Sequence, residues 1–181
     1  MGLQNTTLLQ TDALSDQSWH KTINDIKMKK TLFLIIAASL SITLQAQSET
    51  TERNIEMAET FMDSANEYFE NEEYDKALEL YQKALNIQRP LLGENDMEVG
   101  FTYAMIAHTH VYKEEYEKAL EYYEKAIPIY AFHEGELSEN VSQLYRSCII
   151  CCTFLGDRDR ANYYREKAVE AIFFMDWILC R

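Results

Sequence analysis

The chain has 181 residues, of which 47% are apolar, and it carries a formal net charge of −13 with only two prolines and five glycines. This length and apolar content allow one ordinary folded core and exclude disordered and fibrous proteins. The acidic balance argues against binding to nucleic acid or anionic membrane surfaces, whose phosphates would repel it. Abundant Ala, Glu, Lys, Leu and Tyr, without alternating β-branched runs, favour helices over strands.

The N-terminal segment, residues 1–27, is polar and shows no periodic pattern. A signal peptide does not usually carry such a long preface, so we expect translation to begin at Met28 and the segment to be non-native. The alternative is a genuine N-terminal extension that stays disordered, as chain termini commonly do.

Residues 28–46 have the order of a secretory signal peptide. Lys29 and Lys30 are positive, residues 31–44 are mostly apolar, and Ala46 is a small residue that precedes polar sequence. The apolar run is shorter than the roughly 20 residues that a membrane-spanning helix needs, so we expect no stable membrane span. The sequence thus predicts a bacterial protein that is cleaved near Ala46 and exported to the periplasm or the medium.

A short sequence recurs at a constant interval of 42 residues. It reads DKALELYQKAL at residues 75–85, EKALEYYEKAI at residues 117–127 and, more weakly, DRANYYREKAV at residues 159–169. Each copy places two alanines seven residues apart, which is nearly two helical turns, so both lie on one helix face. Small side chains on that face let a neighbouring helix approach closely, and a fixed period of this size indicates a repeat architecture.

A second helical pattern precedes each copy, with apolar residues at spacings of three, four and seven. Short polar breaks at residues 71–73, 113–115 and 156–157 separate the two patterns. Each repeat is therefore predicted to be a helix, a tight turn and a second helix. The upstream stripes are Phe61, Ala65 and Tyr68, then Tyr103, Ile106, Ala107 and His110, then Tyr145, Cys148, Ile149 and Cys152.

The second helix of each repeat resembles that of a tetratricopeptide repeat, in which tyrosines and alanines alternate at set spacings. The 42-residue period is similar to a longer variant of this repeat that is found in kinesin light chains and many bacterial proteins. The resemblance covers about residues 58–171 and is weaker in the third copy, where Arg158 and Arg165 replace tyrosines. It rests on Tyr74, Ala77, Tyr81 and Ala84, and on Tyr116, Ala119, Tyr123 and Ala126.

This resemblance implies an all-α fold, in which about three antiparallel helix-turn-helix repeats stack as a short right-handed α-solenoid. The repeat domain is expected over residues 50–175, and residues 176–181 are an apolar tail. Pro128 is expected to kink or end its helix, because it removes a backbone donor. The repeats are placed at residues 58–99, 100–141 and 142–175.

The resemblance further implies that the first helices line a concave groove, which commonly receives a peptide or an extended partner. Some members hold a C-terminal carboxylate with a clamp of Lys, Asn and Arg. Only Asn66 matches a clamp position here, so an apolar contact surface is expected instead, although some of its side chains could pack against their own loops. The groove residues expected are Met62, Asn66, Phe69, Phe101, His108, Val111, Gln143, Arg146 and Ile150.

No recognisable catalytic or metal-binding pattern is found in the sequence. His108 and His110 are two residues apart, roughly 200° around a helix, so they cannot share a metal ion from one helix. The HEGE sequence at His133 lacks the second histidine of a zinc-protease helix. We therefore expect no enzymatic activity, no metal and no cofactor.

Three cysteines, Cys148, Cys151 and Cys152, lie close together in the third repeat. They could form a redox pair, a soft-metal site or a tether to Cys180. We favour a role as small apolar filler, because Cys148 and Cys152 occupy stripe positions and free cysteine is among the most buried residue types.

Two classes of function remain open from the sequence. The first is an exported protein–protein interaction module that binds a peptide or protein of unknown identity in its groove. The second is a self-associating structural part of a longer repeat-containing protein, such as an exported sensor. The apolar residues 172–179 could fold back as a cap on the third repeat, form an interface, or be covered by a helix of a longer protein. We favour an interface, with self-association through the C-terminal end, or a longer protein over self-capping, because large exposed apolar patches usually mark association sites.

Overall fold

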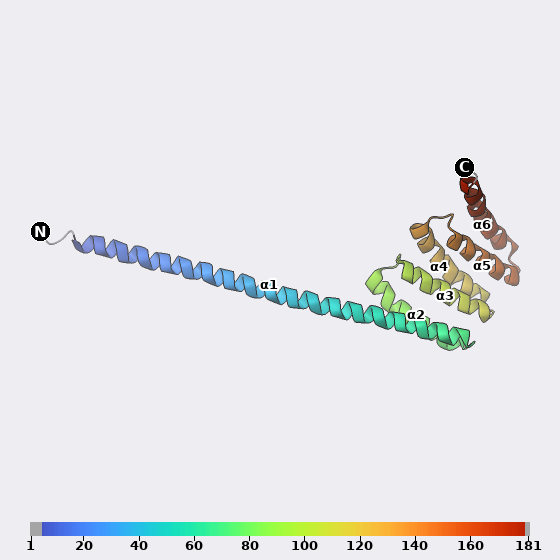
Figure 1. The fold of residues 1–181 in the computed structure, drawn as a ribbon, viewed down its shortest axis with the longest axis horizontal. Coiled ribbons are helices and arrows are strands. Elements are labelled where there is room, and N and C mark those ends of the chain that lie inside the picture. The colour runs from blue at the N-terminus through green and yellow to red at the C-terminus, as the bar shows by residue number, and fades with distance from the viewer. Residues whose placement is uncertain (1–4, 180–181) are drawn as a thin grey trace. The chain divides into compact units, whose positions relative to one another are not determined.

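The computed structural model describes the backbone of residues 5–179 and the side chains of residues 27–169. Six α-helices follow one another in this part of the chain, and no strand is present in it (Figure 1). The prediction of an all-α fold is therefore confirmed. The chain divides into two compact units, residues 1–50 and residues 51–181, and the first helix, α1 (Asn5–Glu70), belongs to both.

In the first unit, α1 is continuous from Asn5 through the segment that the sequence assigns to a signal peptide. All side chains of residues 27–50 are exposed. The hydroxyls that interrupt the apolar run donate to carbonyl oxygens three or four residues earlier, as Ser39 Oγ does to the Ile36 oxygen at 2.8 Å, so they do not break the helix. By length and composition this helix could cross a membrane, a criterion that an N-terminal signal sequence also meets.

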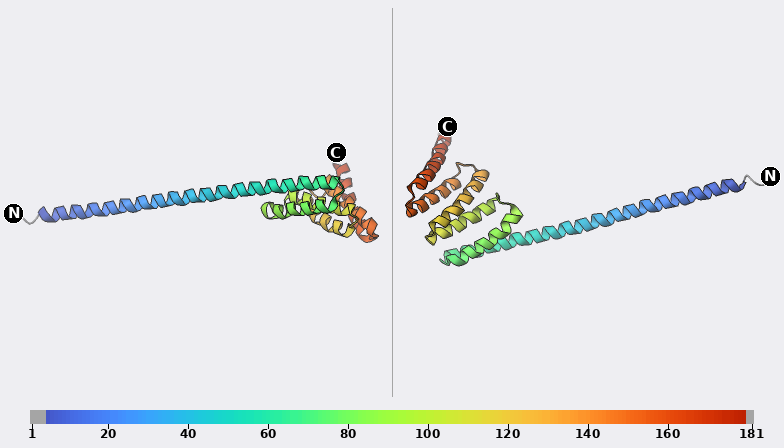
Figure 2. Two further views of the ribbon diagram at one scale, coloured as in Figure 1. Left: turned by 90° about the horizontal axis from the view of Figure 1, so that it is seen from below. Right: turned by 180° about the vertical axis from the view of Figure 1, so that it is seen from behind.

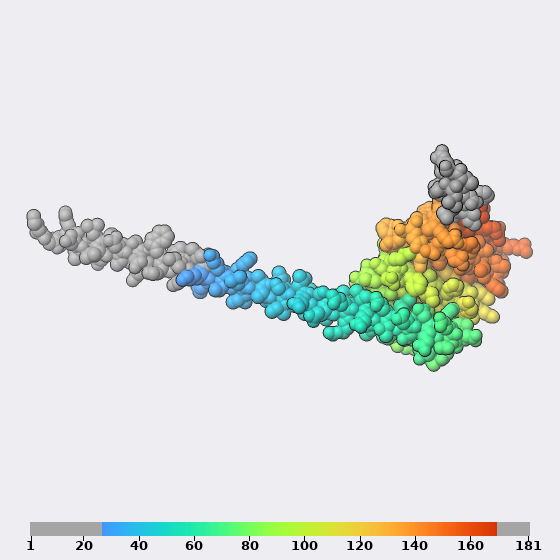
Figure 3. All heavy atoms as spheres, in the orientation of Figure 1, coloured from blue at the N-terminus to red at the C-terminus, as the bar shows by residue number. Residues whose placement is uncertain are grey.

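The second unit is a stack of helix pairs. Residues 51–70 of α1 pair with α2, α3 pairs with α4, and α5 pairs with α6, and consecutive helices from α2 to α6 lie side by side in each view (Figures 1 and 2). The space-filling view shows residues 51–169 packed into one continuous body (Figure 3). The bounds are α2 (Tyr74–Leu92), α3 (Met97–Tyr112), α4 (Tyr116–Glu134), α5 (Glu139–Leu155) and α6 (Arg158–Leu179).

The 42-residue period of the sequence is also the period of the structure. Helices α2, α4 and α6 begin 42 residues apart, and so do α3 and α5. Residues 42 apart are thus structurally equivalent. The repeat boundaries expected from the sequence fall inside helices, however, because α3 and α5 begin at Met97 and Glu139.

Equivalent tight turns join the two helices of each pair. The central residue is left-handed in all three, with φ of 62° at Glu72, 60° at Glu114 and 74° at Gly156. The residue that follows donates its N–H to the carbonyl five residues back, at 2.9 Å each time. This is the bonding of a Schellman motif, which satisfies carbonyls at the end of the first helix and reverses the chain. The turns predicted at residues 71–73, 113–115 and 156–157 are therefore confirmed.

The connections between repeats are short loops, residues 93–96 and 135–138. Each ends in a side chain that caps the next helix. Asp96 accepts from the N–H of Glu98 at 2.9 Å, and Ser138 Oγ accepts from the N–H of Val141 at 3.2 Å. Such caps supply acceptors for N–H groups that have no partner within the helix.

Proline does not end either helix that contains it. Helix α4 continues past Pro128 to Glu134, and α2 continues past Pro90 to Leu92. Of the two outcomes expected at Pro128, a kink or an end of the helix, the end is therefore wrong. Both prolines are exposed. Water can therefore reach the carbonyl that the missing proline N–H leaves without a donor, which lowers the cost of keeping proline within the helix.

Small residues set the spacing between the helices. The alanine pairs of α2 and α4 are completely buried, and Tyr81 and Tyr123 fill the space beside them. Gly100 of α3 shows how tight this packing is, because a Cβ added there would lie 2.8 Å from Ile129 Cγ2 of α4. The equivalent positions, Ala58 and Ser142, are also small and buried. The core therefore depends on close helix approach.

We expect Glu114→Gly to raise the free energy of unfolding by roughly 0.5 to 1 kcal/mol, because glycine adopts the left-handed turn conformation without the steric cost that other residues carry. Urea denaturation of the chain followed by circular dichroism measures this. As a control, Glu121→Gly in the middle of α4 should lower stability by about 1 kcal/mol. A loss of stability in Glu114→Gly equal to that of the control would contradict this account of the turn.

Candidate partner-binding surface

The nine residues expected in the groove, which we call the groove face, lie on the first helix of each pair. Phe101, His108, Gln143, Arg146 and Ile150 are exposed. The half-buried members are Asn66, Phe69 and Val111, whereas Met62 is only 7% exposed.

Met62 belongs to the core more than to any surface. Thr102 Oγ1 approaches its sulfur at 3.4 Å and also donates to Gln88 Oε1 at 2.7 Å, so α1, α2 and α3 meet at this point. Because a buried side chain has little area to offer, Met62 can contribute little to contact with a partner. The flexible thioether instead fills an irregular space among three helices.

Aromatic rings gather at one end of the groove face. Tyr112 of α3 lies at the centre of this cluster, with Phe69 of α1 edge-on at 5.1 Å between ring centroids and Tyr74 of α2 stacked at 5.8 Å. His108 contacts the same ring at 6.2 Å. The structure thus brings Phe69 and His108 together through Tyr112, which the sequence analysis did not include in the groove. Tyr112 is 57% exposed and available to a partner.

The next repeat contains an equivalent aromatic pair. Tyr116 of α4 and Phe154 of α5 stack at 4.7 Å between centroids, with only 3° between their planes. These residues follow Tyr74 and Tyr112 by 42 positions, and Phe154 is 67% exposed. The 42-residue period could have identified this pair from the sequence, because an aromatic residue recurs 42 residues after both Tyr74 and Tyr112. Exposed aromatic rings therefore occur on consecutive repeats.

Polar groups of the groove face are mostly occupied within the protein. Asn66 Oδ1 accepts a hydrogen bond from Tyr81 Oη at 2.6 Å. Arg146 pairs with Glu139 at 2.5 Å. Although His108 is partly exposed, desolvation beside its aromatic neighbours lowers its pKa, which favours the neutral ring near pH 7. The face consequently lacks the free cations that a clamp for a C-terminal carboxylate would need.

His110 has a structural role. Its ring stacks on Tyr122 at 5.6 Å, and its Nδ1 lies 2.8 Å from Glu115 Oε2. A hydrogen bond from Lys118, together with the one from His110, holds the pKa of Glu115 at about 2. Burial lowers the pKa of His110 itself, although Glu115 opposes this effect. Within residues 27–169, the structure shows no cluster of His, Cys, Asp and Glu that could hold a metal ion.

Cys148, Cys151 and Cys152 are free thiols and completely buried. Burial raises the pKa of each, to about 11 for Cys151, so all three remain protonated near neutral pH. Because the thiolate is the reactive and metal-binding form, this environment favours their interpretation as apolar filler. Cys180 and the side chains of the apolar segment 172–179 lie outside the described residues.

Stacked helix pairs with equivalent turns and a repeating core define an α-solenoid repeat protein. Residues 56–131 match the model of the tetratricopeptide repeat family. Residues 56–131 therefore form tetratricopeptide repeats, and the all-α solenoid fold expected from the sequence is confirmed.

Solved structures of three proteins share this fold. The TPR domain of Arabidopsis FLU is 15% identical with a TM-score of 0.57, and the match covers 68% of this chain and 98% of that one. BtubC (BKLC) from P. vanneervenii is 23% identical with a TM-score of 0.54, over 74% of this chain and 58% of BtubC. The N-terminal domain of stress-induced protein-1 (STI-1) from C. elegans is 13% identical with a TM-score of 0.55, over 65% and 86%. A comparison with curated protein sequences gives no match.

Proposed function

We propose that this chain is an exported protein–protein interaction module that binds a peptide or an extended protein segment on its groove face. The observation that carries the proposal is the row of exposed apolar and aromatic side chains on the first helices. Phe101 and Tyr112 lie on α3, and Ile150 and Phe154 lie on α5. Exposed apolar side chains that recur on consecutive repeats can serve as contact points along an extended partner.

The charges and apolar side chains of this surface limit the class of partner that it can bind. Because the free cations of a carboxylate clamp are missing, a C-terminal carboxylate is a poor ligand. The net charge of −13 favours a partner with neutral or basic residues beside its apolar anchors. The binding segment would therefore have aromatic or aliphatic anchors spaced to reach α3 and α5. Such a scaffold function requires no catalysis, in keeping with the usual role of this fold.

We expect Phe101→Ala with His108→Ala to weaken partner capture about tenfold or more, since the double substitution removes an apolar contact and an aromatic neighbour of Tyr112. Crosslinking in the native host, followed by quantitative mass spectrometry of captured proteins, measures the effect, and circular dichroism verifies unchanged helicity.

Phe132→Ala is the matched control, because Phe132 is a highly exposed aromatic residue on α4, a second helix of a repeat. It should leave capture unchanged. Equal capture by the groove variant and the parent would move the binding site away from the groove face.

Export is proposed on the signal-peptide order of residues 28–46, whose apolar side chains are all exposed on α1. We expect a signal peptidase to cleave after Ala46, so that the exported protein begins at Gln47. N-terminal sequencing of the protein recovered from the periplasm or the medium measures this. An exported protein that still began at Met1 or Met28 would contradict cleavage after Ala46, and absence of the protein from both the periplasm and the medium would contradict export.

A further inference from the structure

At both ends of the repeat array, charged residues stand at positions whose internal equivalents pack between repeats. Inside the array, the second helix of each repeat packs on the first helix of the next. Tyr74 of α2 stacks on Tyr112 of α3, and Tyr116 stacks on Phe154 in the same way. The residue of α6 equivalent to Tyr74 and Tyr116 is Arg158. The residue of α1 equivalent to Tyr112 is Glu70.

A second position shows the same substitution of charge for aromatic packing. Tyr123 of α4 is buried beside Ser147 and Cys151 of α5. The equivalent of Tyr123 on α6 is Arg165, which is exposed. On α1, 84 residues before Ser147 and Cys151, the equivalents are Asp63 and Glu67, and both are exposed. If a helix equivalent to α3 and α5 packed on α6 in the same way, it would meet arginines. The α1 residues equivalent to the α3 and α5 partners are carboxylates.

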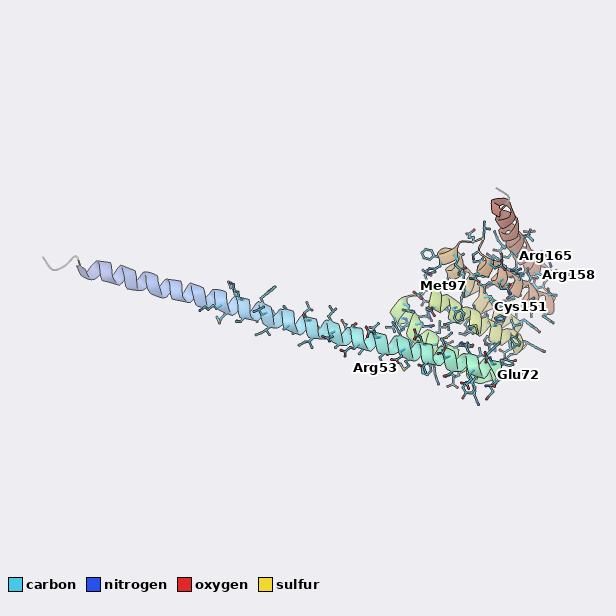
Figure 4. The ribbon with its side chains drawn as sticks, in the orientation of Figure 1. Arg53, Glu72, Met97, Cys151, Arg158 and Arg165 are labelled. Atoms are coloured by element: carbon cyan, nitrogen blue, oxygen red, sulfur yellow. The ribbon has the colours of Figure 1, made fainter. Side chains whose placement is uncertain are left out.

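These charged side chains are available for contact. Figure 4 labels Arg158 and Arg165 on α6, where they line a cavity of about 480 Å³ together with Asn162. Arg165 donates to Asn162 Oδ1, a neutral partner. Among the residues whose side chains the structure describes, neither arginine forms an ion pair, and the same holds for Asp63, Glu67 and Glu70 of α1.

Apolar area is also left uncovered at both ends. Met57 of α1 is 42% exposed, although its equivalent Val99 is completely buried between repeats. Val169 of α6 is exposed as well, whereas its equivalent Leu85 in α2 is buried. Covering these side chains would add a hydrophobic contribution to the charge contacts.

We propose that the exposed face of α6 binds residues 51–70 of α1 from a second copy of this chain, so that the solenoid continues from one molecule into the next. Arg158 contacts Glu70 of the second copy, and Arg165 contacts its Asp63 and Glu67. The contact is heterologous, since different surfaces meet, and each added copy again exposes one α1 face and one α6 face. Linear head-to-tail assemblies result.

Charge complementarity argues for a second copy as the occupant. The protein is acidic overall, and the exposed arginines of the α6 face attract an acidic partner surface. Residues 51–70 of α1 supply carboxylates at the repeat positions that face these arginines. Residues 51–70 of a second copy would therefore place carboxylates of opposite charge at the positions that face Arg158 and Arg165. This inference is independent of the groove, because neither end face uses Phe101, His108 or Ile150.

The test uses full-length chains with two different tags, co-expressed in the native host and captured through one tag. When both tagged chains carry the α6 charge reversal, Arg158→Glu with Arg165→Glu, recovery of the other tag should fall about tenfold. This corresponds to a loss of about 1.4 kcal/mol in binding free energy. Reversal of the α1 charges, Glu67→Arg with Glu70→Arg, should do the same. A chain that carries all four substitutions should recover most of the self-capture, because the signs match again between positions 158 and 70 and between positions 165 and 67. Asp63 is unchanged in this chain and keeps the recovery incomplete. Added salt should weaken capture of the parent.

Two controls separate this contact from other effects. Glu121→Arg with Glu136→Arg changes as many charges away from both ends and should leave self-capture unchanged. The groove variant Phe101→Ala with His108→Ala should also retain self-capture, which distinguishes this inference from the proposed groove function. Circular dichroism verifies the fold of each variant. The inference is overturned if the parent does not capture itself, if the reversals have no effect, or if the fourfold variant fails to recover, and the charged ends would then be solubilising caps.

Discussion

The close approach of helices across small buried residues is the constraint on which the rest of this structure depends. Alanines at equivalent positions of α2, α4 and α6 are buried, and Gly100 leaves no room for a Cβ against Ile129. This spacing brings the first helix of each repeat close enough for Tyr81 and Tyr123 to be covered. The turns and capped loops then return the chain to the same position every 42 residues. This regularity determines which side chains remain outside the core and are available to a partner.

The parts of the fold that follow from local periodicity could be predicted from the sequence. The alanine spacing, the stripes and the polar breaks identify the helices and the turns, because each depends on residues within two helical turns of one another. That α4 does not end at Pro128 could not be judged from the sequence, because the local cost of proline depends on exposure. Helices α3 and α5 begin at Met97 and Glu139, directly after Asp96 and Ser138, which are strong capping residues.

The groove face was harder to predict, because burial there depends on tertiary contacts. Met62 has the sequence position of a groove residue, yet α2 and α3 enclose it. Tyr112 and Phe154 were overlooked because their importance lies in pairing with Tyr74 and Tyr116, which are 38 residues away in each case. These pairs can be recognised in the sequence only when residues 42 positions apart are compared across the repeats. The same comparison reveals the charged residues at the two ends.

The most direct test of this account is the free energy of unfolding of Ala119→Leu, measured by urea denaturation of the chain. Ala119 is completely buried in the helix stack, so a leucine there should lower stability by about 1 to 3 kcal/mol or more through overpacking. Glu121→Leu adds the same side chain on the exposed face of the same helix and should change stability by no more than about 0.5 kcal/mol. Equal stability of the two variants would contradict the claim that close helix approach at the alanine positions holds the solenoid together.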